Sequence, residues 1–246
     1  MPLYIDDHDG VAVLKLDRPP VNATDLATLD ELTAALEQAA AAKALVLTGE
    51  GKIFSAGADL QAVLNADADY ITAAIDALTK CFRTLFTCPR PVVAAINGHA
   101  LAGGCVLSCG CDYRVLAAGA RIGAIEHQAG VPFPAWALEL VRFGVNNEHV
   151  SEVILFGRAY DATTALEIGL VDEVTDGDVV ARSLEVAQEL AAIPAPSFSL
   201  TKKGLRQATV EAADRLSSQI DDEVKRAWCS EEVLSAVRRQ LAALRS

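Results

Sequence analysis

Residues 95–114, AINGHALAGGCVLSCGCDYR, decide the fold, and their pattern allows three interpretations. They belong to a membrane span, hold a metal ion through cysteines, or form a turn whose backbone amides face an anion. Residues 91–111 carry no formal charge, and about 20 apolar residues suffice to cross a bilayer. However, Asn97 would put an unpaired polar group into the lipid, and Gly103 and Gly104 weaken a helix. The pattern therefore favours a buried strand, a turn and a short packed helix.

The cysteines of this segment are the basis of the metal alternative. Cys105, Cys109 and Cys111 follow His99 closely, but their spacing lacks the paired CxxC of structural zinc sites. We therefore expect small buried thiols and no metal. The N-terminal residues show no basic region followed by a long apolar stretch. Six cysteines in such a chain favour reduced thiols, and we expect a cytoplasmic protein.

The composition indicates a folded globular chain. It has 246 residues, of which 52% are hydrophobic and 22% charged, enough for one large domain or two small ones. The 33 acidic residues outnumber the 21 basic ones, and the formal net charge is -12. A surface of that charge repels phosphate backbones, so we expect neither a nucleic-acid nor a membrane partner.

Alternating strand and helix patterns predict an α/β core over the first half of the chain. Asp9 and Gly10, between two short apolar runs, predict a tight hairpin. The elements predicted next are a helix over 25–41, a strand over 44–48, a helix over 70–87, a strand over 91–96, a helix over 103–110 and a strand over 113–118. This alternation is typical of crossover connections between neighbouring strands.

Strand patterns nearly vanish after residue 135. Predicted helices cover 135–144, 148–157, 161–169, 178–193 and 198–243. The interruption Pro194-Ala195-Pro196 separates the last two. We therefore divide the chain into an α/β core, residues 1–194, and a C-terminal helical region, residues 195–246.

Two strand-to-helix junctions share one form, a short apolar strand followed by small residues and the start of a helix. They are ALVLTGEGKIFSAGADL, residues 44–60, and VVAAINGHALAGGCVL, residues 92–107. Glycine and alanine let a ligand approach the backbone, and the first N–H groups of a helix lack partners within the helix. Two such amides on one oxygen would form an oxyanion hole. The alternative is that the small residues serve close packing alone.

Four motifs, in this order and spacing, carry a family resemblance. LDRPPVNAT at 16–24, FSAGADL at 54–60, INGHALAGG at 96–104 and FGRAYDATTALEIGLVDEV at 156–174 resemble the crotonase (enoyl-CoA hydratase/isomerase) superfamily. The resemblance implies a crotonase-type ββα core with an acyl-CoA site in residues 1–194. It also implies that residues 195–246 are a helical trimerisation region packed on neighbouring subunits of a homotrimer or hexamer.

The same resemblance assigns roles to individual residues. The amides of Ala58 and Gly103 would hold the thioester oxygen while negative charge develops on it. Coenzyme A is part of the substrate, and no metal or further cofactor is implied. Its predicted contacts are Arg18, Val21, Ala23, Ala56, Asp59 and Leu60.

Proton transfer is assigned to a single glutamate. Hydratases of this family usually carry one glutamate in the pattern GGCEL, where this chain has Val106. The second family glutamate matches Glu126 in RIGAIEHQAGVPFP, residues 121–134. Its apolar neighbours would desolvate the carboxyl group and raise its pKa. One carboxylate can move a double bond, whereas water addition normally wants a second group. We therefore predict an enoyl-CoA isomerase in preference to a hydratase.

Alternatives remain open. A hydratase that works with one glutamate and a non-catalytic acyl-CoA binding protein would both use the same pocket. A serine protease on a related fold would need a nucleophile turn, which the sequence around Ser108 and His99 lacks. Pro134 stands where dienoyl-CoA isomerases need an acid, and the negative charge disfavours RNA binding.

The sequence allows more than one role for His127 and for three apolar residues that follow it. His127 adjoins Glu126, but neighbouring side chains on a regular element seldom point the same way. Phe133, Trp136 and Leu140 have helical spacing, so they either line an acyl pocket or pack in the core.

Overall fold

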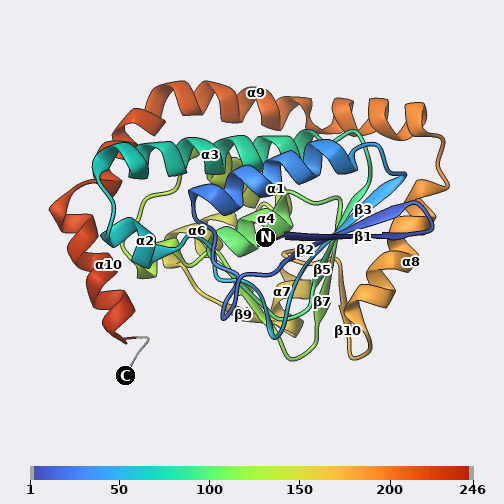
Figure 1. The fold of residues 1–246 in the computed structure, drawn as a ribbon, viewed down its shortest axis with the longest axis horizontal. Helices are drawn as coiled ribbons and strands as arrows, with labels where there is room; N and C mark the ends of the chain where they lie inside the picture. Colours follow the sequence, from blue (N-terminus) through green and yellow to red (C-terminus); the bar gives the residue numbers. More distant parts are fainter. Residues whose placement is uncertain (1–2, 244–246) are drawn as a thin grey trace.

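The computed structural model describes residues 3–243, which form a six-stranded sheet covered by helices (Figure 1). In sheet order the strands are β1 (Leu3–His8), β2 (Val11–Leu16), β3 (Ala44–Gly49), β5 (Val92–Ile96), β7 (Tyr113–Ala117) and β10 (Glu173–Thr175). β1 is antiparallel to β2, and the other neighbours are parallel. The predicted hairpin is confirmed, with positive φ angles at Asp9 and Gly10.

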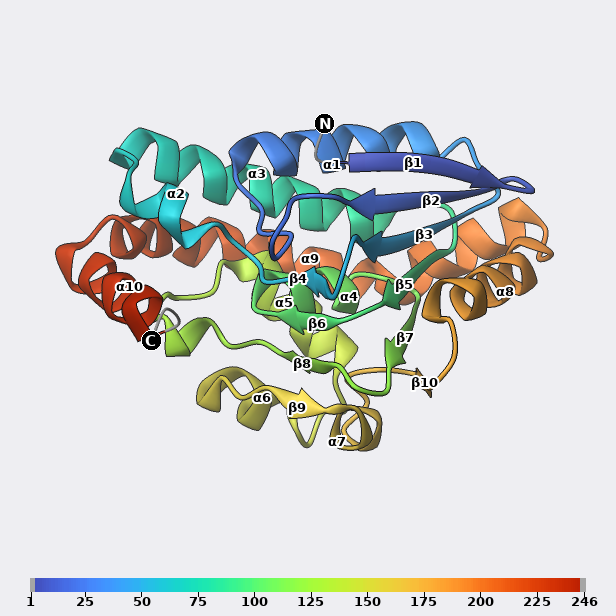
Figure 2. The ribbon, with the colours of Figure 1, turned by 60° about the horizontal axis from the view of Figure 1, so that its bottom comes forward.

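A second sheet of four short strands lies beside the first (Figure 2). Its strands are β4 (Ile53–Ser55), β6 (His99–Leu101), β8 (Arg121–Gly123) and β9 (Tyr160–Asp161). The sequence analysis predicted none of these four strands, and it also missed β10 after residue 135. Each has at most three residues, too few for an alternating pattern, so pairing with distant segments defines them.

Most helices agree with the predicted pattern, but the helix Leu60–Leu64 was not predicted, and the helix predicted over 198–243 forms two, Ala195–Trp228 and Glu231–Ala243. The helices are α1 (Leu26–Ala39), α2 (Leu60–Leu64), α3 (Ala68–Thr87), α4 (Gly103–Cys109), α5 (Ala135–Gly144), α6 (Val150–Phe156), α7 (Ala162–Glu167), α8 (Val179–Ala191), α9 (Ala195–Trp228) and α10 (Glu231–Ala243). A single 3-10 turn, η1, covers Glu126–Gln128. α1 and α3 pack against each other, and α8 packs against β3, β5 and β7.

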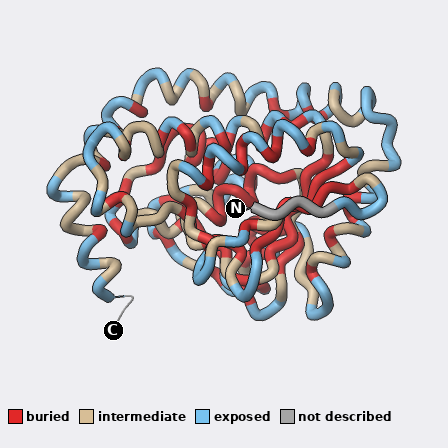
Figure 3. The backbone as a smooth tube through the Cα atoms, in the orientation of Figure 1, coloured by how far each residue is buried: buried red, intermediate tan, exposed pale blue. Residues whose placement is uncertain are grey.

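Both faces of the central strands are buried, as Figure 3 shows. Leu45 and Leu47 of β3 belong to the main core with α1, α3 and α4, whereas Val46 faces a smaller core under α8. Side chains alternate between the faces of a strand. Coverage on both faces therefore explains why parallel strands here read as continuous apolar runs. The apolar run of β5, residues 92–96, is thus a buried strand.

The C-terminal helices pack on their own chain. α9 begins at Ala195, at the predicted boundary, and lies along α3 and α5, while α10 folds back beside α2 (Figure 1). These helices therefore complete the same subunit that contains the core. Their packing on neighbouring subunits and the division of the chain at residue 194 stay predictions.

The opening segment forms a strand, a turn and a helix, as predicted. Residues 91–111 contain β5, the short strand β6 and α4. Within residues 3–243 we find no helix that is both long and apolar enough to cross a bilayer. Most apolar residues of the segment are buried in the core of the protein.

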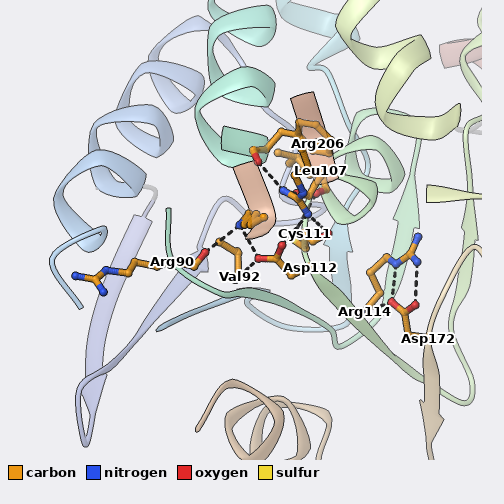
Figure 4. A network of polar contacts seen from close by, with 11 residues as sticks. Arg90, Val92, Leu107, Cys111, Asp112, Arg114, Asp172 and Arg206 are labelled. Carbon is orange, nitrogen blue, oxygen red and sulfur yellow. Dashed lines mark hydrogen bonds and ion pairs between the residues drawn. The ribbon is translucent and has the colours of Figure 1, made fainter. Parts of the chain in front are cut away.

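A buried ionic network joins α9 to the ends of α3 and α4 (Figure 4). Asp112 lies between two cations of α9, with Lys202 Nζ at 2.6 Å from Oδ2 and Arg206 Nη2 at 2.8 Å from Oδ1. The Arg206 guanidinium also donates to the carbonyl oxygens of Phe86, Gly110 and Cys111. It thereby satisfies backbone acceptors at the C-terminal ends of both helices, where a positive charge is favourable.

Candidate active site

A mostly apolar cavity of about 420 Å³ lies between α2, α3, η1 and the C-terminal helices. One face of α3 contributes six lining residues: Tyr70, Ile71, Ala74, Ile75, Leu78 and Phe82. Ala58, Gly103 and Glu126 line the same cavity. The structure thus brings together the three residues that the sequence assigns to chemistry, although they come from three separate segments.

Ala58 carries the unoccupied amide of its loop. The other amides of this loop all have acceptors: Ala56 N donates to Val21 O at 3.0 Å, Gly57 N to Ser55 Oγ at 3.1 Å, and Asp59 N to Thr24 O at 2.9 Å. Among the described residues, Ala58 N donates to no backbone carbonyl. Since Ala58 is partly exposed and lines the cavity, its N–H is a candidate ligand donor.

Gly103 supplies a second amide next to the first. It is the first residue of α4, and Ala102 before it offers no side-chain cap. A methyl group built on Gly103 would lie 3.7 Å from the Ala58 nitrogen, which places the two backbones side by side. Ala102 adopts φ 50 and ψ -125, a conformation that costs a non-glycine residue roughly 1–3 kcal/mol. Strain of this kind is common at functional turns.

The carboxyl group of Glu126 is buried in the cavity wall. Oε2 has no hydrogen-bond partner among the described residues, even though the residue as a whole is only half-buried. Burial raises its pKa from 4.5 to about 8. The desolvation predicted from its apolar neighbours is therefore present, and the group sits in the range useful for proton transfer near neutral pH.

The loop after Glu126 is held by the C-terminal helices, which the sequence analysis did not connect with the site. Trp228 Nε1 donates to Pro132 O at 2.9 Å, and Asp221 Oδ1 accepts from the amide of Ala135 at 2.9 Å. Trp228 and Gln240 also line the cavity. α9 and α10 therefore form part of the site of their own chain.

The predicted coenzyme A contacts fall into two groups. Ala56, Asp59 and Leu60 line the cavity. The other three lie on the adjoining segment and are not among the described lining residues: Arg18, Val21 and Ala23. The roles of these six residues in binding coenzyme A stay predictions.

Val106, Ser108 and His99 are not among the described residues that line the cavity. Val106 is buried in the core. Ser108 Oγ is buried and donates to Cys105 O at 2.7 Å, so it is not an accessible nucleophile. His99 Nδ1 accepts from the amide of Arg121 at 3.0 Å, which is a structural role. Within residues 3–243 no cluster of three or more metal-binding side chains occurs.

Of the two interpretations of Phe133, Trp136 and Leu140, the structure supports core packing. All three belong to the main core and are not among the described residues that line the cavity. Trp136 and Leu140 lie on α5, Phe133 precedes it, and Trp136 Nε1 donates to Asp214 at 3.2 Å. His127 is exposed, and its Nδ1 lies 3.2 Å from the carbonyl oxygen of Leu155. This contact points the imidazole toward α6.

Two strand-to-helix junctions, next to a buried carboxyl group in an apolar cavity, define an enzyme of the crotonase fold. The fold matches the crystal structure of human mitochondrial delta3-delta2-enoyl-CoA isomerase with a TM-score of 0.93 and 28% identity, covering 100% of this chain and 98% of that one.

The chain belongs to the enoyl-CoA hydratase/isomerase family, whose model matches residues 6–234. The mitochondrial enoyl-CoA delta isomerase 1 of Mus musculus is 34% identical over 88% of this chain and 76% of its own length. The 2,3-dehydroadipyl-CoA hydratase of Escherichia coli is 31% identical, over 84% and 82% of the two chains. The family resemblance drawn from the four motifs is thereby confirmed.

Proposed function

We propose that this enzyme moves a carbon–carbon double bond in an enoyl-CoA thioester by a shuttle through Glu126. The observation that carries the proposal is the buried Oε2 of Glu126, which has no hydrogen-bond partner among the described residues and lies in the same cavity as Ala58 and Gly103. The other lining carboxylates, Asp25 and Asp59, are already engaged as helix caps. The similarity to delta isomerases supports this assignment.

The proposed reaction balances without any added group. The amides of Ala58 and Gly103 donate to the thioester oxygen, which stabilises the enolate that forms. The Glu126 carboxylate takes a proton from C2 of a 3-enoyl-CoA, and the electron pair spreads over C2, C4 and the thioester oxygen. The carboxylic acid then returns the proton to C4, which yields the 2-enoyl-CoA. The apolar lining of the cavity suits the acyl chain.

Product analysis in deuterated water tests the proposal. With 3-enoyl-CoA we expect 2-enoyl-CoA carrying deuterium, whereas 2-enoyl-CoA should give little 3-hydroxyacyl-CoA. Hydration as the main reaction would support the alternative of a one-glutamate hydratase, which the similarity to a hydratase favours. Acyl-CoA binding without exchange would support a non-catalytic binding protein.

The pH dependence should follow the raised pKa of Glu126. The proton acceptor is the ionised form, so kcat/KM for 3-enoyl-CoA should rise about tenfold per pH unit below the pKa. It should level off above about pH 8, where the carboxyl group is ionised. A stopped assay of kcat/KM between pH 5.5 and about 9 measures this limb. A flat profile over this range, which a carboxyl group with the usual pKa of 4.5 would give, would contradict the assignment.

Gly57→Ala should damage the pair of amides. Gly57 has φ +82, and a methyl group on it would lie 2.6 Å from Gly103 N. One displaced oxyanion donor typically costs about 10²–10³ in kcat, and we expect a loss of that order. Gly51→Ala is the matched control, because Gly51 also has a positive φ, +78, and its added methyl group meets nothing within 4 Å. Equal kcat values for the two variants would show that the amides do not act together.

We further propose a homotrimer or hexamer in the cytoplasm, with coenzyme A entering only as part of the substrate. Exposed apolar side chains on α6 and α9 support an oligomer: Leu155, Phe156, Leu200 and Leu205. Light scattering during size-exclusion chromatography tests it, and a monomer mass at working concentration would reject it.

A further inference from the structure

Arg18 lies between two segments that meet at the loop of Ala58. Its Nη2 is 2.7 Å from Asp25 Oδ2 and 3.2 Å from Asp59 Oδ2. Its Nη1 donates to Ala23 O at 3.2 Å and to Thr28 Oγ1 at 3.1 Å. Both nitrogens at the end of the guanidinium group are therefore occupied by this chain's own acceptors.

The two aspartates divide their oxygens in the same way. Asp25 Oδ1 caps α1 by accepting from Thr28 N, and Asp59 Oδ1 caps α2 by accepting from Gln61 N and Ala62 N. In both residues Oδ2 is left for Arg18. Partial burial opposes the ionisation of Asp25, but its hydrogen bonds from Thr28 and its contact with Arg18 outweigh this and lower its pKa.

The backbone between these caps fixes Ala58. Thr24 N donates to Gly57 O at 2.8 Å, and Asp59 N donates to Thr24 O at 2.9 Å. Thr24 thus pairs with both residues that flank Ala58, as a parallel bridge. Arg18 joins Asp25, the residue after Thr24, to Asp59, the residue after Ala58. It closes the bridge next to Ala58, which lines the cavity.

We propose that Arg18 is a positioning residue for the Ala58 amide and does not bind the phosphates of coenzyme A. This inference rests on the proposed function of the same site. Without the guanidinium group, two carboxylates that share one nitrogen would face each other and repel. The loop would then move, and displacement of a donor by about 1 Å can lower the rate about 10²-fold.

The test compares two thioesters of the same 3-enoyl chain, one of coenzyme A and one of pantetheine, which lacks the nucleotide phosphates. In Arg18→Met we expect kcat to fall by about 10-fold to 10²-fold for both thioesters. The dissociation constant of free coenzyme A, measured by calorimetry, should stay unchanged. Lys52→Met removes an exposed charge from the neighbouring loop and serves as the control.

Two further variants separate positioning from general loss of structure. Asp25→Asn in the Arg18→Met background removes one facing carboxylate while asparagine still caps α1, so kcat should recover in part. The kcat of Arg18→Lys should lie between those of the wild type and Arg18→Met. If Arg18→Met does not fold, Arg18→Lys still measures the effect. A loss confined to the coenzyme A thioester, weaker coenzyme A binding, or no recovery in the double variant would overturn the inference. Failure of the wild type to turn over either thioester would instead reject the proposed function.

Discussion

Replacing Glu126 with glutamine is expected to lower kcat for double-bond migration by about 10²–10⁴-fold, the usual contribution of a positioned acid or base. Glutamine has nearly the same shape but cannot accept the proton from C2. Deuterium incorporation from solvent should fall by the same factor, because exchange and migration share this step. The measurement is the rate of 2-enoyl-CoA formation in deuterated water, with mass analysis of the product.

The pH dependence of the stability of Glu126→Gln provides a control for its folding. The pKa of Glu126 is about 8 in the folded protein against 4.5 for the ordinary group. Stability from the protonated carboxyl is fully present below pH 4.5 and is lost as pH rises through about 8. Glu126→Gln avoids this loss of up to about 1.4 kcal/mol per pH unit. Its stability relative to the wild type should therefore increase between those pH values in urea unfolding.

Retained activity in Glu126→Gln would contradict the single-glutamate mechanism. Lost activity together with unchanged acyl-CoA affinity would support it, because the glutamine still fills the cavity wall. A wild type and a variant that both bind acyl-CoA without exchange would instead indicate a binding protein.

The sequence predicts long elements better than short ones. α3 occupies Ala68–Thr87 against a prediction of 70–87, because its apolar residues repeat over several turns. β4, β6 and β8 have three residues each and were missed. They are strands only because β4 and β8 both pair with β6. Local pattern contains no information about such pairing.

The candidate site divides in the same way. Ala58, Gly103 and Glu126 follow from motifs and line one cavity. The side chains that hold the Glu126 loop cannot be predicted from motifs, because Asp221 and Trp228 lie 86 and 96 residues from their partners. The family resemblance predicts Arg18 as a coenzyme A contact, whereas its contact with Asp59, 41 residues away, is not apparent from the sequence. Contacts across such distances depend on the tertiary fold.

Removing the carboxylate of Asp112 from the buried ionic network should lower the free energy of unfolding more than removing an exposed ion pair. Asp112→Ala leaves Lys202 and Arg206 buried without a counter-charge, and it also removes the acceptor of the Val92 amide at 2.8 Å. Burial lowers the pKa of Lys202 and that of Arg206, although the charge of Asp112 opposes this in both. Both cations therefore depend on this one carboxylate within the network.

We expect Asp112→Ala to lower the free energy of unfolding by about 3–5 kcal/mol, the usual cost of an uncompensated buried charge. Asp76→Ala is the control, because Asp76 pairs with Lys225 but its side chain is 57% exposed. Exposed pairs contribute about 0–1 kcal/mol. The measurement is the free energy of unfolding of both variants in urea. Equal losses of this free energy would mean that α9 packs on the core through its apolar contacts alone. Arg206 also donates to the carbonyl oxygen of Gly110, directly after α4. Loss of the network should therefore also displace the Gly103 amide, which lies at the other end of that helix.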